Sequence, residues 1–237
     1  MIRCFITDCS PLEDTVPYSR AYALLSDSRR DVADGYRFMK DRILSVTAGL
    51  FMRAVEDSYG KITVDANGKP HAPGIGFNVS HSGHYVAFAC SDRPVGIDIE
   101  GIGRNMDIAE SVMTPAEYSD FKDSVDECDR ERVFIRMWTA KESYMKALGL
   151  GFRLPPESFR VLYGYELRAP DENMALHELE APQGYCASVC SADDEVSCVR
   201  LDVEDLMDSV SGHGRSFFHR CPLDRPFKDL VDATVIP

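Results

Sequence analysis

The sequence predicts an α+β protein built from two comparable halves. Strand-like runs rich in β-branched and aromatic residues occur at 1–6, 75–100 and 174–202. Apolar residues spaced three or four apart predict helices over 27–56 and 126–148. Because each half offers helical segments and about three strands in similar order, the pattern suits a duplicated unit, although no residue-level repeat accompanies it.

Local cues divide the first half into elements. The apolar start is expected to form a strand, and further strands are predicted at 61–65, 75–79, 85–90 and 94–100. Gly35 is a possible break that would split the helix over 27–56 into two. Asn67-Gly68 supplies the positive φ of a tight turn, and Ser80-His81-Ser82-Gly83 is interpreted as a polar corner between two strands.

The second half begins after a connector at 101–105, so residues 1–103 and 104–210 are the predicted lobes and 211–237 a tail without periodicity. Thr114-Pro115-Ala116-Glu117 combines an N-cap, a proline at the first helical position and a glutamate three residues after the cap. Gly149 can end the second long helix. The remaining elements expected are strands at 159–162, 174–180, 185–190 and 197–202, and a short helix at 202–210.

Two carboxylates stand at alternate positions of the predicted strand Pro94–Glu100. Asp98 and Glu100 therefore share one face, while Ile97 and Ile99 point to the opposite face and into a core. Like charges this close repel, so such a pair is either solvated on a polar strand face or shares a cation. The strand alone leaves both readings open.

Charge and composition exclude several classes of function. Acidic residues outnumber basic ones 39 to 26, and the net charge of -13 argues against a general nucleic-acid binder. No apolar run approaches the ~20 residues of a membrane span, and the start is too short for a secretory signal. The eight cysteines lack zinc-site pairs and are expected to be reduced thiols in a cytoplasmic protein.

Four blocks occur in an order that resembles the 4′-phosphopantetheinyl transferases, in particular the two-lobed, monomeric group. They are Gly68-Lys69-Pro70, the run from Phe77 to Gly83, Gly96-Ile97-Asp98-Ile99-Glu100, and the run from Trp138 to Ala147. The resemblance covers roughly residues 28 to 160. It implies a pseudo-two-fold pair of similar α+β lobes with the active site in the cleft between them.

By this resemblance the protein would transfer the 4′-phosphopantetheine arm of coenzyme A to a serine of an apo acyl or peptidyl carrier protein. Adenosine 3′,5′-bisphosphate would be released, and the carrier would serve fatty acid, polyketide or nonribosomal peptide synthesis. The metal would be Mg²⁺, with Mn²⁺ as a substitute, because hard cations prefer oxygen ligands. The expected metal ligands are Asp98, Glu100 and Glu142.

The resemblance also implies roles for further side chains. Glu142 would be a general base, a metal ligand or both, and Lys146 would hold the pyrophosphate as a point charge. The catalytic set is thus Glu142, Lys146 and His81, and the residues expected to bind coenzyme A are Lys69, Pro70, Ser80, His81, Arg37, Arg30 and Lys146.

The sequence departs from the family pattern in two places, and two other functions are possible readings of it. Ser28-Arg29-Arg30-Asp31 stands where the family has a lysine-rich stretch, and the chain beyond Asp202 has no counterpart. The main alternative is a non-catalytic protein that binds coenzyme A or a nucleotide in the same cleft. Another phosphoryl or nucleotidyl transferase is disfavoured because the Gly-x-x-x-x-Gly-Lys-Ser/Thr loop is absent.

Overall fold

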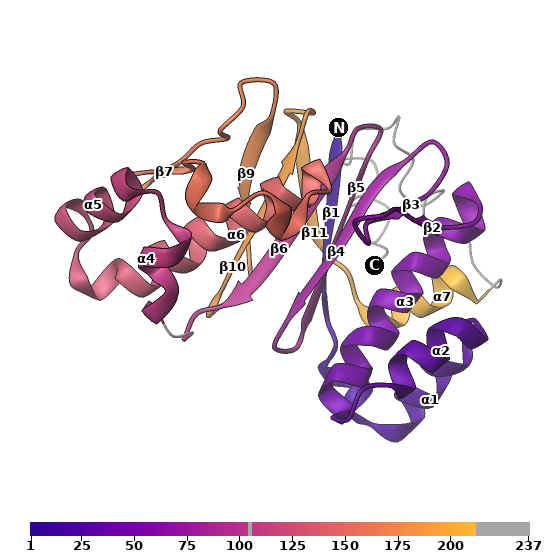
Figure 1. Ribbon diagram of the computed structural model, residues 1–237. Coiled ribbons are helices and arrows are strands. Elements are labelled where there is room, and N and C mark those ends of the chain that lie inside the picture. Colours follow the sequence, from indigo (N-terminus) through magenta and orange to yellow (C-terminus); the bar gives the residue numbers. More distant parts are fainter. Residues whose placement is uncertain (104–105, 212–237) are drawn as a thin grey trace, which may run out of the picture.

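The protein is described by a computed structural model, in which residues 1–103 and 106–211 of the 237-residue chain are placed. The described residues form two main sheets that lie edge to edge, each covered by its own helices, and two short two-stranded sheets (Figure 1). This mixed architecture confirms the predicted α+β class. Apart from Ser211, the predicted tail at 211–237 lies outside the described residues.

The first sheet has four strands in the order β11-β1-β5-β4. Neighbours are antiparallel except that β11 runs parallel to β1. The strands are β1 (Ile2–Asp8), β4 (Gly76–Ser82), β5 (Tyr85–Ser91) and β11 (Val196–Arg200). The helices on this side of the molecule are α1 (Thr15–Ala23), α2 (Asp27–Asp34), α3 (Met39–Tyr59) and α7 (Val203–Val210) (Figure 1).

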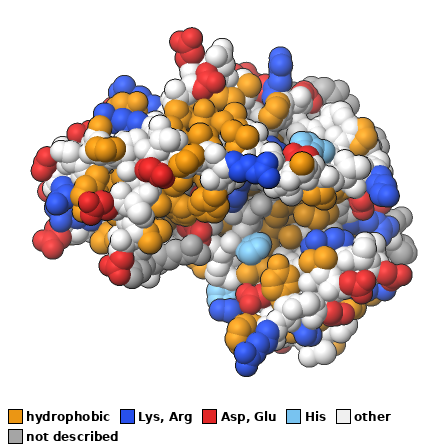
Figure 2. Space-filling view, viewed as in Figure 1, with side chains coloured by type: hydrophobic (Ala, Val, Ile, Leu, Met, Phe, Trp, Pro, Cys, Tyr) orange, Lys and Arg blue, Asp and Glu red, His pale blue; other side chains and the backbone are white. Residues whose placement is uncertain are grey.

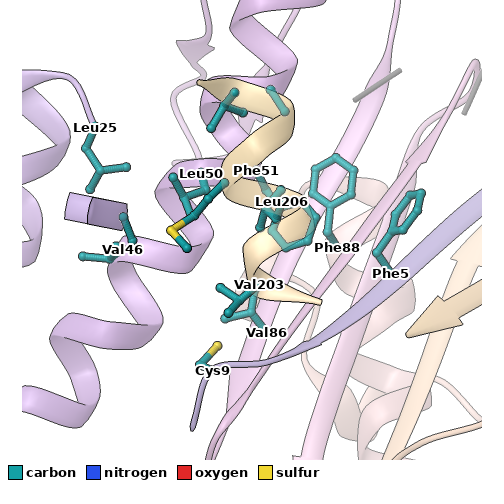
Figure 3. Close-up of a cluster of buried hydrophobic side chains, with 14 of the residues drawn as sticks. Phe5, Cys9, Leu25, Val46, Leu50, Phe51, Val86, Phe88, Val203 and Leu206 are labelled. Carbon is teal, nitrogen blue, oxygen red and sulfur yellow. The ribbon is translucent and has the colours of Figure 1, made fainter. Parts of the chain in front are cut away.

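Apolar side chains of α3 and α7 form the main core against β1 and β5 (Figure 3). Phe51 of α3 stacks on Phe88 of β5 with ring centroids 4.8 Å apart. Leu206, from the end of the chain, packs in the same cluster as Phe5, from its beginning. Burial of such aromatic and aliphatic groups is worth about 1.5–3 kcal/mol each and holds α3 on the sheet.

The second sheet has three antiparallel strands in the order β6-β10-β9. These are β6 (Val95–Gly101), β10 (Tyr185–Ser191) and β9 (Ala175–Leu179), and α6 (Arg130–Leu148) lies across them. The shorter elements are α4 (Ala109–Val112), α5 (Pro115–Ser124), β2 (Thr63–Val64), β3 (Pro70–His71), β7 (Leu162–Tyr163) and β8 (Glu166–Leu167). Short 3-10 turns occupy Ser10–Glu13, Met106–Ile108, Glu127–Asp129, Gly151–Arg153 and Pro156–Ser158.

Strand pairing crosses the boundary that the sequence predicts between 1–103 and 104–210. β6 belongs to the first half of the chain but pairs with β10, and β11 belongs to the second half but pairs with β1. The division into these lobes stays a prediction, since each sheet takes one strand from the other half. The exchange ties the two halves together through backbone hydrogen bonds.

Several local predictions are confirmed. The chain breaks between α2 and α3 with Gly35 as the C-cap residue of α2. Thr114 and Glu117 form the full capping box at the start of α5. Gly149 ends α6 in the left-handed conformation, with φ 69°.

Other local predictions are wrong. Ser80, His81 and Ser82 are part of β4, and the turn falls at Gly83 and His84. Of the strand expected at 159–162, only residue 162 lies in a strand, the short β7, and residues 159–161 form no helix or strand. Helix α1 was not predicted, because its single fully buried residue, Ala21, leaves no helical stripe to read.

Two further expectations concern cysteines and membranes. The seven cysteines within the described part are free thiols, as predicted, and Cys221 lies outside it. None of the helices in residues 1–103 and 106–211 combines the length and apolar character that a membrane-spanning segment needs.

The contact of α6 with β6 depends on Gly96. A Cβ atom at this position would lie 2.1 Å from the carbonyl oxygen of Ser143 and 2.3 Å from the backbone nitrogen of Ala147. Both neighbours are backbone atoms of α6, so they cannot move away without moving the helix. A glycine here therefore lets the helix rest directly on the strand that carries Asp98.

The first prediction follows from this contact. Replacement of Gly96 by alanine should lower the free energy of unfolding by about 1–3 kcal/mol, because overpacking forces backbone shifts. Urea unfolding at equilibrium measures the change. Gly101→Ala on the same strand is the control, since its Cβ would lie 3.5 Å from the nearest atom, in ordinary contact. Equal stability of the two variants would contradict the account.

Candidate functional site

The two main sheets meet where β4 faces β6. Side chains of β4 form hydrogen bonds with the backbone of β6 across this edge. The amide oxygen of Asn78 accepts a hydrogen bond from the backbone N–H of Ile97, at 3.0 Å. The hydroxyl of Ser82 accepts one from the N–H of Gly101, at 3.2 Å. Alternate polar residues at 78, 80 and 82 therefore hold β6 beside β4, a role that the reading of a polar corner missed.

Asp98 is the centre of the site. Its side chain is 4% exposed, and its Oδ1 accepts hydrogen bonds from the Ser80 hydroxyl at 2.7 Å and the Lys146 ammonium at 2.6 Å. Lys146 also donates to the Ser80 hydroxyl, at 3.2 Å. The other oxygen, Oδ2, is buried and has no hydrogen-bond partner among the described residues. A buried carboxylate oxygen left in this state is suited to bind a cation.

Glu142 lies one helical turn before Lys146 and is the second carboxylate near its ammonium, at 3.9 Å. Burial raises the pKa of Glu142, and the charges of Asp98 and Glu100 raise it further, whereas Lys146 opposes the shift. The electrostatic effect of both strand acids on Glu142 agrees with the predicted grouping of the three carboxylates. It also means that extra positive charge would stabilise the ionised form.

The described side chains do not form a preassembled set of metal ligands. Within residues 1–103 and 106–211, no three His, Cys, Asp or Glu side chains stand in positions that would hold an ion together. The ammonium of Lys146 lies between Asp98 and Glu142 and takes the place of a shared cation. The donor set still fits Mg²⁺ in its chemistry: three carboxylates, with one buried oxygen of Asp98 unused.

Comparison with known proteins identifies the family to which this chain belongs. The model of the 4′-phosphopantetheinyl transferase superfamily matches residues 94–195. The chain is 33% identical over 178 residues to 4′-phosphopantetheinyl transferase gsp of Aneurinibacillus migulanus, which covers 68% of this chain and 70% of that protein. It is 30% identical over 190 residues to a 4′-phosphopantetheinyl transferase of Bacillus subtilis, which covers 73% and 84%. The chain belongs to the 4′-phosphopantetheinyl transferase superfamily.

A third relative supports the same assignment. The transferase is 33% identical over 150 residues to 4′-phosphopantetheinyl transferase Sfp of Bacillus subtilis strain 168, which covers 60% of this chain and 63% of that protein. The resemblance read from the four blocks, and the enzyme class that it implies, are therefore confirmed. These names do not support the alternative of a binding protein without transferase activity.

The residues expected to bind coenzyme A are not all brought to the carboxylates of the transferase. Ser80 reaches Asp98 directly, and His81 follows it on β4. Desolvation and the nearby Lys146 ammonium lower the pKa of His81, although its side chain remains accessible to solvent. Pro70 lies on β3 and lines a surface cavity of 310 Å³.

The two arginines expected to bind coenzyme A, Arg30 and Arg37, contact residues other than Asp98. Arg30 donates to the carbonyl oxygens of Tyr22 and Ala23, at 3.2 and 2.8 Å. Arg37 is exposed and lies over the ring of Phe38, 5.3 Å from its centroid. Figure 2 shows the surface hollowed between the helices α1–α3 and the part of the molecule that contains α5 and α6.

Lys141 is a functional neighbour whose role the sequence did not reveal. It forms an ion pair with Glu117 at 2.7 Å, in which both side chains are fully buried. It also donates to the carbonyl oxygens of Pro156 and Phe159. The pair fixes the middle of α6, and hence the direction in which Glu142 points.

The buried pair generates the second prediction. Lys141→Met should destabilise the transferase by about 3–5 kcal/mol, because Glu117 would keep a buried charge without its partner. The double variant Glu117→Gln, Lys141→Met should cost clearly less than the two single variants together. Arg168→Met, which breaks an exposed pair with Glu166, is the control and should cost less than about 1 kcal/mol. Additive effects of Glu117 and Lys141 in urea unfolding would argue against the pair.

Proposed function

We propose that this transferase moves the 4′-phosphopantetheine group of coenzyme A onto a serine hydroxyl of an apo acyl or peptidyl carrier protein. Adenosine 3′,5′-bisphosphate is the other product. The observation that carries the proposal is the cluster at the meeting of β4, β6 and α6, where Asp98, Lys146 and Ser80 are joined by short hydrogen bonds. Such a cluster offers both a cation site and a cationic side chain to a pyrophosphate.

Asp98, Glu100 and Glu142 are the residues that would hold Mg²⁺ or Mn²⁺. The unused buried oxygen of Asp98 and the mutual charge effect of the three acids support this proposal. When bound, the metal would neutralise charge on the pyrophosphate of coenzyme A and help to orient it. Since Lys146 shares Asp98 in the structure, its ammonium would have to turn from the carboxylate towards the phosphates.

Glu142 is proposed to accept the proton of the attacking serine. Its pKa is raised by burial, and a raised pKa makes a carboxylate a better proton acceptor near neutral pH. Ser80 and His81 would hold a phosphate from the β4 side through a hydroxyl and an imidazole N–H. The same position of Glu142 would allow it to bind the metal as well, so the proposal includes both roles for this carboxylate.

The 3′-phosphate is proposed to meet a cation of the α2–α3 region. Arg37 is the better of the two predicted arginines, because its guanidinium is exposed while Arg30 already donates to carbonyl oxygens of α1. Monomeric state, cytoplasmic location and the lack of nucleic-acid or membrane partners remain predictions from the sequence.

The third prediction tests the transfer itself. Incubation with coenzyme A, Mg²⁺ and an apo carrier protein should add one phosphopantetheinyl group to the carrier, visible by mass spectrometry. Asp98→Asn and Glu142→Gln should each lower the transfer rate at least about 100-fold, the usual scale for loss of charge stabilisation or of a general base.

The exposed acid Glu172 offers a matched control, and Glu172→Gln should transfer at the wild-type rate. A near wild-type rate for Asp98→Asn would show that this carboxylate is structural. Absence of transfer by the wild-type protein to fatty acid, polyketide and peptide carriers alike would remove the proposed function.

A further inference from the structure

Lys69 lies in the turn between β2 and β3 but does not face solvent with its ammonium. Its Nζ donates hydrogen bonds to three backbone carbonyl oxygens: that of Lys146 at 2.6 Å, of Ala147 at 2.9 Å and of Val95 at 3.3 Å. The first two acceptors belong to the last turn of α6 and the third to the start of β6. One side chain thus bridges the helix of Lys146 and the strand of Asp98.

The position suits a cation for two physical reasons. The last carbonyl groups of a helix lack partners within the helix, and the helix dipole is negative at this end. The backbone N–H groups of Gly149 and Leu150 reach Lys146 and Met145, and Lys69 adds donors from outside the helix. A lysine from a distant turn therefore completes the C-terminal cap of α6.

The surrounding turn supports the same contact. The side-chain amide of Asn67 donates to the carbonyl oxygen of Gly149 at 2.9 Å, and Arg153 donates to the other end of that amide. The stem of Lys69 passes close to Gly149, where an added Cβ would lie 3.1 Å from Lys69 Cδ. The turn thus contacts the end of α6 at several points, which holds the ammonium of Lys69 against the carbonyl groups.

Three protons are all that an ammonium group can donate. Because each proton of Lys69 has a carbonyl acceptor, binding a phosphate would require breaking at least one of these bonds. Burial lowers the pKa of Lys69, and the charge of Asp65 opposes this shift. The three acceptors of its ammonium are neutral carbonyl groups. The contacts therefore differ from the phosphate-binding role that the resemblance implies for this lysine.

We infer that Lys69 is a positioning residue, which holds the last turn of α6 against β6 and so sets where Lys146 stands relative to Asp98. The kinetic consequence of this inference rests on the proposed transfer function. The contact of Lys69 with α6 does not depend on that function. Lys146 donates to Asp98 from the same residue whose carbonyl Lys69 binds, so loosening the turn would misplace the ammonium. Misplacement of about 1 Å costs on the order of 100-fold in rate.

The fourth prediction compares Lys69→Met with Lys61→Met, which removes the same charge from an exposed position in the same region. In the full-length protein, Lys69→Met should lower kcat for carrier loading at least about tenfold and leave KM for coenzyme A within about twofold. Hydrogen exchange at the amides of Gly149 and Leu150 should become at least about tenfold faster. Lys61→Met should match the wild type in all three.

Other outcomes overturn the inference. A KM for coenzyme A that rises about tenfold or more, with kcat and exchange unchanged, would make Lys69 a phosphate ligand. A lower melting temperature with unchanged kcat and exchange would make its role merely structural. If Lys69→Met does not fold, Lys69→Gln, which keeps an amide donor, takes its place in the same measurements. If the wild type loads no carrier, the proposed function fails, while hydrogen exchange still decides whether Lys69 holds the helix.

Discussion

Direct contact between the backbones of α6 and β6 is the constraint on which the site depends. Gly96 allows it, because any larger residue would meet the carbonyl of Ser143 and the nitrogen of Ala147. At this distance a lysine on the helix can reach a carboxylate on the strand, and Asp98 and Lys146 do so at 2.6 Å. The covalent spacing within β6 and within α6 then places Glu100 and Glu142 near enough for the charges of Asp98 and Glu100 to act on Glu142.

Electrostatics explains why the buried charges at this contact are paired. A carboxylate that is almost fully buried costs several kcal/mol unless a cation and hydrogen bonds satisfy it. Asp98 receives both from Lys146 and Ser80. The same logic applies to Lys141 and Glu117 on the far side of α6. The helix is thus held by one ion pair that is closed to solvent, Lys141–Glu117, and one whose lysine is partly exposed, Lys146–Asp98.

Much of this arrangement could be predicted from the sequence. Alternation in β6 places Asp98 and Glu100 on one face, with Ile97 and Ile99 in a core, as the structure confirms. Helix caps at Thr114 and Gly149 were also readable, because capping depends on a few adjacent residues.

What could not be predicted depends on contacts between distant segments. No local sequence pattern shows that β6 and β11 pair with strands of the other half, because the residue pattern of a strand does not depend on its neighbour. The sequence predicts a phosphate contact for Lys69 and no role for Lys141, because their acceptors, backbone carbonyl groups and Glu117, come from distant segments of the chain. The presence of a lysine in the sequence does not show whether its ammonium binds a phosphate or caps a helix.

If Asp98, Glu100 and Glu142 hold the metal as proposed, Lys146 and a divalent cation compete for one place among these carboxylates. Titration of Mn²⁺ into the protein without coenzyme A, followed by electron paramagnetic resonance, tests it most directly. Lys146→Met should bind Mn²⁺ at least about tenfold more tightly than the wild type, because the competing charge 2.6 Å from Asp98 is gone. Equal or weaker binding by Lys146→Met would contradict the account.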